Sequence, residues 1–276
     1  MARRRAHGET ARRFSRRVNV VISQSMYFPW VGFLEQLRVA DVFVRYDDVQ
    51  FSKGSFTNRV QIKTATGSRW MTIPLGGHKL GQRIDEVQAA SERNWRDQHI
   101  SQLAESYRGS AHGEDMLTVA RQALDTASNN VGDIAYASMR ALTRYFGLDH
   151  RVQWRNVAEL GIGGASSNRV LDIVQALGGT RYVTGHGARN YLDHEAFEKA
   201  GIEVCYMYYN CLPYPQPHGL FTPYVSGLDL VASCGHAGRA FIEPQISPWR
   251  EFSAGADQSK KGASQTVGQP GYRSTT

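Results

Sequence analysis

Two adjacent carboxylates follow an apolar run near the start of the chain. Asp47 and Asp48 come directly after residues 42–46 (VFVRY), a run typical of a buried strand. Like charges this close oppose joint ionisation, which suits a pair of metal ligands or a general base that removes a proton. Because adjacent residues on a strand point to opposite faces, we expect only one carboxylate to enter a site. The alternative is that Asp48 only caps the turn after the strand.

Amide and basic side chains come after the two carboxylates. Gln50 lies in the loop that follows, and Asn58 comes just before a predicted strand. On that strand Arg59, Gln61 and Lys63 alternate onto one face. Arginine binds phosphate or carboxylate through bidentate hydrogen bonds, and lysine acts as a point charge. We therefore predict that Asn58, Arg59 and Lys63 contact an anionic ligand, with Gln50 beside them. A solvated strand face would explain the same alternation.

A third group of residues follows the first predicted strand, residues 18–23 (VNVVIS). Gln24, Tyr27 and Trp30 lie between this strand and a predicted helix, whose free N-terminal N–H groups favour negative charge. We predict that these three residues bind an anionic or planar ligand. The alternative is that the aromatic side chains belong to the core. Residues 30–33 (WVGF) stand where nucleotidyltransferases carry His-x-Gly-His, so a nucleotide-activating site rests on fold analogy alone.

A histidine between two glycines follows a later predicted strand. Gly185 and Gly187 flank His186, a pattern that allows a ligand to approach the backbone closely and leaves the imidazole accessible. We predict that His186 acts as an acid or base and that Tyr191, further along the loop, contacts the substrate. A loop histidine without a visible partner is also often structural or merely exposed.

Metal and disulfide chemistry find little support in the sequence. The three cysteines, Cys205, Cys211 and Cys234, form no C-x-x-C pair, so we predict neither a disulfide framework nor a cysteine-based zinc site. Four further histidines are too scattered to propose a metal site: His78, His99, His194 and His218. We also expect no covalently bound cofactor.

The elements that must position these residues alternate between strands and helices. Strands at 18–23 and 42–46 enclose a helix at about 29–40, the size of a right-handed parallel crossover. A hairpin, three helices and further strands follow at 59–63 with 69–75, at 95–108, 114–127 and 131–146, and at 152–157, 181–185 and 202–209. This order predicts an α/β fold with a Rossmann-like, mostly parallel sheet, a β-hairpin and a helical insertion at about 92–148. Ligands bind such sheets at the carboxyl ends of the strands, where the loops described above would meet.

The formal net charge of +7 belongs to the ends of the chain. Residues 1–17 hold seven Arg and one Glu, and the short 254–276 segment is also basic, so residues 18–253 carry a balance of −1. We predict that both ends are disordered, because they cannot bury enough apolar surface to fold. The neutral body argues against duplex DNA binding, whereas the Arg-rich arm could bind tRNA. No apolar run approaches the roughly 18 residues of a membrane span, and we predict a cytoplasmic protein.

Linked motifs in the first third of the chain resemble a known family. They read ISQSMYFPWVG, ADVFVRYDDVQF, NRVQIK and WMTIP, and they closely resemble the opening of the WbqC-like proteins. Residues 182–204 and 221–235 resemble that family's second half, so the resemblance covers about 18–245, nearly all of the predicted domain at 18–253. Two positions depart from the pattern: Ser23 stands where many members have His, and Ser25 stands where many have Pro.

WbqC-like proteins occur in O-antigen, surface-polysaccharide and natural-product gene clusters, so the resemblance implies a tailoring step in carbohydrate or other small-molecule biosynthesis. Our leading hypothesis is a transferase that moves an acyl or aminoacyl group to an amino group of an amino sugar or natural-product intermediate. Asp48, with Asp47 beside it, or His186 would remove the proton from the attacking amine. Arg59 and Lys63 would neutralise the anionic group of the substrate. The activated donor could be acyl-CoA, aminoacyl-tRNA or a nucleotide.

Two alternative functions stay open at this point. The first is a nucleotide-dependent activating enzyme, which would release pyrophosphate from ATP or CTP. The second is a non-catalytic binding or scaffolding subunit of a biosynthetic pathway, with the aromatic loops as its interface. The sequence identifies neither the donor, the acceptor nor the oligomeric state.

Overall fold

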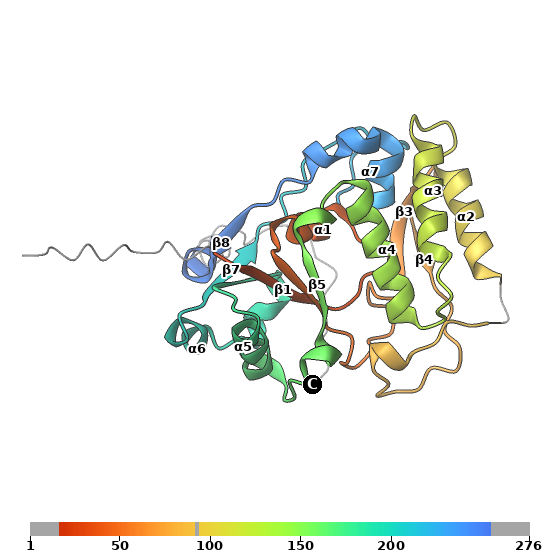
Figure 1. The fold of residues 1–276 in the computed structure, drawn as a ribbon. Helices are drawn as coiled ribbons and strands as arrows, with labels where there is room; N and C mark the ends of the chain where they lie inside the picture. The colour runs from red at the N-terminus through yellow and green to blue at the C-terminus, as the bar shows by residue number, and fades with distance from the viewer. Residues whose placement is uncertain (1–16, 92–93, 255–276) are drawn as a thin grey trace, which may run out of the picture.

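The computed structural model describes residues 17–91 and 94–254, and a six-stranded sheet lies at its centre (Figure 1). The strand order is β5-β2-β1-β6-β7-β8. The pairs from β5 to β7 are parallel, and β8 pairs antiparallel with β7. The strands are β1 (Asn19–Ser23), β2 (Val42–Arg45), β5 (Gln153–Asn156), β6 (Arg181–Thr184), β7 (Glu203–Met207) and β8 (Ile246–Pro248). The predicted α/β fold with a mostly parallel sheet is confirmed.

The central strand β1 is apolar on both faces. Val20, Val21 and Ile22 are all buried, which is typical of a parallel strand covered by helices on both sides. In register, Val20 lies beside Val42 of β2 and beside Tyr182 of β6. The chain extends the sheet first on the β2 side and later on the β6 side. The order of strands therefore reverses at β1, the position at which open parallel sheets usually bind ligands.

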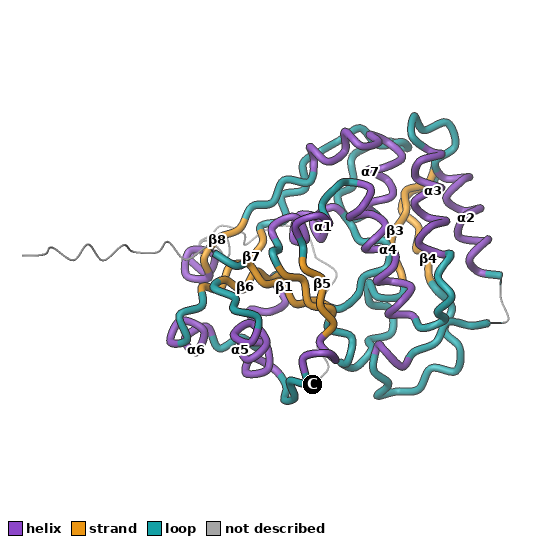
Figure 2. The backbone as a smooth tube through the Cα atoms, in the orientation of Figure 1, coloured by secondary structure: helices purple, strands orange, loops and turns teal. Residues whose placement is uncertain are grey.

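Helices cover the two faces of the sheet unequally. One face packs on α5 (Ser166–Ala176) and α6 (His194–Lys199), and the other on α1 (Val31–Val39), α4 (Val131–Tyr145) and α7 (Gly227–Cys234). The hairpin of β3 (Arg59–Thr64) and β4 (Gly67–Thr72) is a separate two-stranded sheet. It lies on the side of the molecule that holds α2 (Trp95–Ser106), α3 (Gly113–Leu124) and α4 (Figure 2). These three helices occupy the segment predicted as helical.

Most predicted boundaries agree with the structure, with differences at a few ends. Helix α1 begins at Val31 with Trp30 as its N-cap, so Pro29 precedes the helix and does not lie in its first turn. Helix α5 has Ala165 as its N-cap, and the Oγ of Ser167 accepts a hydrogen bond from the N–H of Asp193. The sequence patterns do not predict α7 or β8. The predicted disordered segments 1–17 and 254–276 fall outside the described residues, except for their innermost residues, 17 and 254.

Helix α1 carries a buried carboxylic acid, Glu35, which makes stability depend on pH. Burial is the main cause that raises the pKa of Glu35 from 4.5 to about 7; the Cys211 backbone opposes the shift and Glu243 adds to it. Because the folded protein holds this proton more tightly than the unfolded chain does, Glu35 lowers the free energy of unfolding as the pH rises from 4.5 to 7. We expect Glu35→Gln to be more stable than the wild type by about 3 kcal/mol at pH 8 and by about 1 kcal/mol at pH 5. Urea unfolding at both pH values measures this, and an equal difference at both would contradict it.

Candidate functional site

A cavity of about 1020 Å³ lies where the open end of the β3–β4 hairpin meets the neighbouring loops. We call it the hairpin cavity. Its polar lining consists of Lys53, Asn58, Arg59, Thr72, His78 and Ser91, and Ile73, Pro74 and Leu75 supply apolar contacts. Among the described residues, no Asp or Glu lines it. Two of the predicted ligand contacts, Asn58 and Arg59, therefore lie together in a cavity of the size that takes a small molecule.

Arg59 is held in place without a carboxylate partner. Its guanidinium carbon lies 4.1 Å from the centre of the Trp70 ring. A β-carbon added at Gly54 would lie 3.2 Å from the same carbon, so the guanidinium also packs against the Gly54 backbone. In the described part of the chain, the buried Nε of Arg59 has no hydrogen-bond partner and no acidic side chain pairs with the guanidinium. The group is positioned by stacking and is available to an anion.

Asn58 presents a buried acceptor that no donor satisfies. Its side chain is 3% exposed, and its Nδ2 donates to the carbonyl oxygen of Ile73 over 3.3 Å. That bond orients the amide, since the Nδ2 must face the carbonyl. Among residues 17–91 and 94–254, the buried Oδ1 finds no partner. An unsatisfied buried polar group costs about 1–3 kcal/mol, so such groups are uncommon unless a ligand completes them.

His78 is a third cavity residue with an unpartnered polar atom. Its Nε2 is buried and makes no hydrogen bond to the described residues. The imidazole packs edge-on against Phe51, with ring centres 5.2 Å apart. His78 is one of the four histidines that are too scattered in the sequence to predict a metal site. A local signal was present, because Gly76 and Gly77 directly precede it and allow the chain to turn toward the cavity.

Lys63 does not share the cavity with Arg59. The two residues alternate on one face of β3 as predicted, but Lys63 lies further along the strand and is 3% exposed. Its Nζ donates to the side chain of Gln216 over 3.1 Å and to the carbonyl oxygens of Gly219 and Leu220. The structure thus places Lys63 as the anchor of a distant loop, away from the cavity that Arg59 lines.

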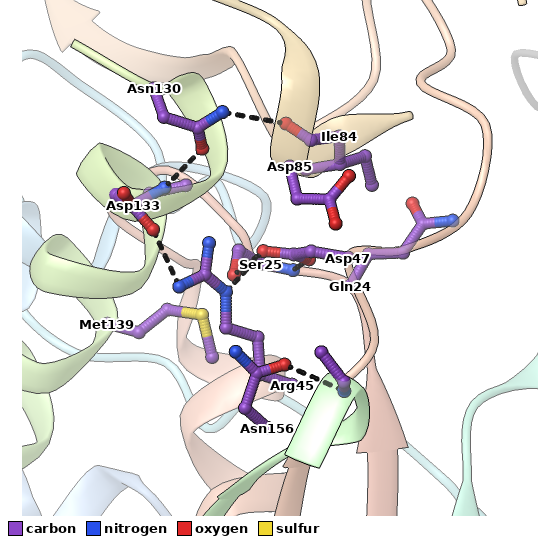
Figure 3. A network of polar contacts seen from close by, with 12 residues as sticks. Gln24, Ser25, Arg45, Asp47, Ile84, Asp85, Asn130, Asp133, Met139 and Asn156 are labelled. Carbon is purple, nitrogen blue, oxygen red and sulfur yellow. Dashed lines mark hydrogen bonds and ion pairs between the residues drawn. The ribbon is translucent and has the colours of Figure 1, made fainter. Parts of the chain in front are cut away.

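The two adjacent carboxylates make separate sets of contacts, and Asp47 is the more buried of them. Figure 3 shows Asp47 beside Ser25 and Arg45. Asp47 accepts hydrogen bonds from the N–H of Ser25 at 2.7 Å, the Oγ of Ser25 at 2.6 Å and the Nε of Arg45 at 2.6 Å. Arg45 also pairs with Asp133 of α4 at 2.8 Å. A proline at position 25 could supply neither the N–H nor the hydroxyl. Ser25, where many members of the family have proline, therefore completes a network of contacts that links β1, β2 and α4.

Asp48 forms an ion pair on the other side. Its Oδ1 accepts from Nη1 of Arg169 at 3.1 Å, and its Oδ2 contacts Nη2 of the same guanidinium. Arg169, on α5, also lies over the ring of Tyr46. The expectation that the two carboxylates diverge agrees with these contacts. Neither carboxylate lines the hairpin cavity.

The loop after β1 is partly core. Tyr27 is fully buried, its hydroxyl lies 2.9 Å from Nδ1 of His99, and burial raises the pKa of Tyr27 well above its usual value. Burial also lowers the pKa of His99 to about 4. Trp30 packs on Tyr209 and Tyr224, with ring centres 5.1 and 5.5 Å away. Gln24 stays exposed at the strand end, so of the three predicted contacts in this loop it is the most accessible.

Gln50 and the loop after β6 lie outside the hairpin cavity. Gln50 is exposed and forms an isolated bridge with Arg83. His186 is exposed, and its Nε2 lies 2.7 Å from the carbonyl oxygen of Met207. The side chain of Tyr209 approaches the backbone at Gly185 closely: a β-carbon there would lie 2.5 Å from its hydroxyl oxygen.

Two tyrosines accompany the loop after β6: Tyr191 follows it in the sequence, and Tyr209 lies beside His186. Tyr191 is 46% exposed, and burial of its remaining surface raises the pKa of its hydroxyl. The ring of Tyr209 lies near both Trp30 and His186. The loop after β1 and the loop after β6 therefore both contact Tyr209.

No metal centre emerges from residues 17–91 and 94–254, since no three His, Cys, Asp or Glu side chains gather there. Of the helices that the structure describes, none has the length and apolar character that a bilayer span requires.

Comparison with known proteins assigns the family. The model of the WbqC-like protein family matches residues 24–240. The chain belongs to this family. A protein of Mycobacterium tuberculosis named "Uncharacterized protein Rv1507c" is 30% identical over 219 residues, which cover 78% of this chain and 94% of that protein. No solved structure matches the chain. In this WbqC-like protein, the matched range includes every residue that lines the hairpin cavity.

Proposed function

We propose that this WbqC-like protein is a group transferase of small-molecule biosynthesis, and that the hairpin cavity binds an anionic intermediate. The observation that carries the proposal is the Arg59 guanidinium, which is fixed by stacking and has no carboxylate partner in the described chain. Lys53 adds a second positive charge to the lining. A phosphate or carboxylate would supply the missing partner, because charge-assisted hydrogen bonds to arginine are among the strongest in proteins.

The transfer that fits this proposal forms an amide on an amino group of an amino sugar or natural-product intermediate. The amine nitrogen attacks the acyl carbon of the donor, and a carbon–nitrogen bond forms as the bond to the leaving group breaks. The leaving group is the thiol of acyl-CoA, the alcohol of aminoacyl-tRNA or the phosphate of an activating nucleotide. The amine proton passes to a base; a thiol or alcohol leaving group takes up a proton, and a phosphate leaves as the anion. The buried, unpartnered Nε2 of His78 is the base that the cavity lining supports best. Such a base contributes about 10²- to 10⁴-fold to the rate.

Asp48 and His186 are the two bases inferred from the sequence, and they serve as comparisons. Asp48 already pairs with Arg169, and His186 already contacts the Met207 carbonyl. Neither lines the hairpin cavity. Asp48→Asn and His186→Ala are therefore expected to slow the transfer much less than His78→Ala does.

Incubation of the purified protein with candidate donors tests the proposal. The donors are acyl-CoA, aminoacyl-tRNA and nucleotide-activated acyl groups, the acceptors are amino-sugar nucleotides, and mass spectrometry detects the amide. We expect one combination to give a product, and His78→Ala to lower kcat by about 10²-fold or more. No product from any combination, or full activity in both Arg59→Ala and His78→Ala, would sink the proposal. Release of pyrophosphate from ATP or CTP would instead favour an activating enzyme.

A further inference from the structure

The unpartnered atoms of the hairpin cavity differ in what they require from a ligand. The Nε of Arg59 is a donor and needs an acceptor, which an anionic group supplies. The Oδ1 of Asn58 is an acceptor and needs a donor, because the Nδ2 of the same amide is committed to Ile73. An anion alone satisfies only the first of these requirements.

The Nε2 of His78 adds a further position that a ligand can complete. In the tautomer that carries its proton on Nδ1, this nitrogen accepts a hydrogen bond. A hydroxyl has one hydrogen and can satisfy one acceptor. An ammonium group has three and can donate to two acceptors at once.

The charges of the cavity lining also restrict which amines can bind. Among the described residues, no carboxylate lines the cavity to balance an amine, and the cations Lys53 and Arg59 would repel a simple one. An amine binds favourably in such a site when the same ligand also carries a negatively charged group.

We propose that the hairpin cavity selects small molecules that carry an amino group and an anionic group together, with the amine on Asn58 and His78 and the anion on Arg59. The inference rests on the proposed function, because it identifies the bound amine with the acceptor of the transferred group. It also places the nitrogen beside His78, the base that would remove its proton. The cavity, at about 1020 Å³, leaves room for the rest of an amino sugar.

Calorimetric binding of matched ligands tests this inference on the full chain. Phosphoethanolamine carries a phosphate and an ammonium group, phosphocholine carries the same phosphate with no N–H, and ethyl phosphate has no nitrogen. We expect phosphoethanolamine to bind about tenfold more tightly than the other two, the usual worth of a hydrogen bond to a charged group. β-Alanine shows whether a carboxylate replaces the phosphate.

Two variants locate the selectivity. Asn58→Ala is expected to remove most of the preference for phosphoethanolamine while ethyl phosphate still binds, and Ser52→Ala, an exposed position on the same loop, is the matched control. If the wild type binds the three phosphates equally, the amine selectivity is overturned. If Arg59→Ala also weakens the binding of all three, the anion site at Arg59 still stands. Failure of all the ligands to bind would overturn both. If Asn58→Ala does not fold, the comparison of ligands on the wild type still decides.

Discussion

Replacing Arg59 with alanine is expected to weaken the binding of ethyl phosphate by about 10- to 100-fold. The stacked guanidinium is the only cation of the cavity lining whose position is fixed by neighbouring groups in the described structure, through Trp70 and the Gly54 backbone. Its removal takes away charge-assisted hydrogen bonds worth about 1.5–3 kcal/mol. Isothermal titration calorimetry at low salt measures the change, and the thermal unfolding temperature should move little.

Two further variants sharpen this prediction. Arg69→Ala removes an exposed arginine from the partner strand of the same hairpin and is expected to leave the affinity unchanged. Arg59→Lys keeps the charge but loses the planar group that stacks on Trp70, so its affinity should lie between those of the wild type and the alanine variant. Equal losses in Arg59→Ala and Arg69→Ala would mean that general surface charge binds the ligand.

Asp47→Ala is expected to lower the free energy of unfolding by about 3–5 kcal/mol, the range for breaking a buried ion pair. The substitution removes an acceptor that serves two donors of Ser25 and one of Arg45. It leaves Arg45, whose side chain is 11% exposed, with Asp133 as its remaining ion-pair partner in the described chain. Urea unfolding followed by circular dichroism gives the value.

Asp85→Ala provides the comparison for Asp47→Ala. Asp85 pairs with Arg83 at the surface, where the side chains are 32% and 50% exposed, and such pairs are worth about 0–1 kcal/mol. If Asp47→Ala proves no more destabilising than Asp85→Ala, the network of Asp47 does not tie the sheet to α4.

The fold follows from local patterns that the sequence carries strongly. The apolar run of β1 and the alternation on the two sides of the turn at Gly67 specify a buried strand and a hairpin without information from distant residues. Such local patterns do not predict helix α7 or strand β8. β8 is three residues long and includes Pro248, so it becomes a strand only because β7 is there to pair with it.

The site could be predicted only in part, because partners come from distant segments. The sequence predicts Asn58 and Arg59 as ligand contacts together because they are neighbours in the chain. Strand alternation places Lys63 on the same face as Arg59. It gives no information about the loop near Gly219, which covers the far end of the strand. Likewise, the sequence alone presents Asp48 as a free base, because its partner Arg169 lies 121 residues away in the chain.

The hairpin cavity also differs in place from the usual ligand site of open parallel sheets. That site would lie at the carboxyl ends of β1 and β6, where Tyr209 lies near the loops that hold Trp30 and His186. The unpartnered groups of Asn58, Arg59 and His78 lie instead at the hairpin. We therefore expect substrate to bind beside the hairpin.

Hydrogen–deuterium exchange with and without saturating ethyl phosphate tests this claim most directly. We expect slower exchange in residues 53–59 and 72–78, which line the hairpin cavity, and unchanged exchange in residues 24–30 and 185–191 at the end of the sheet. Protection confined to 24–30 and 185–191, with none at the hairpin, would contradict it.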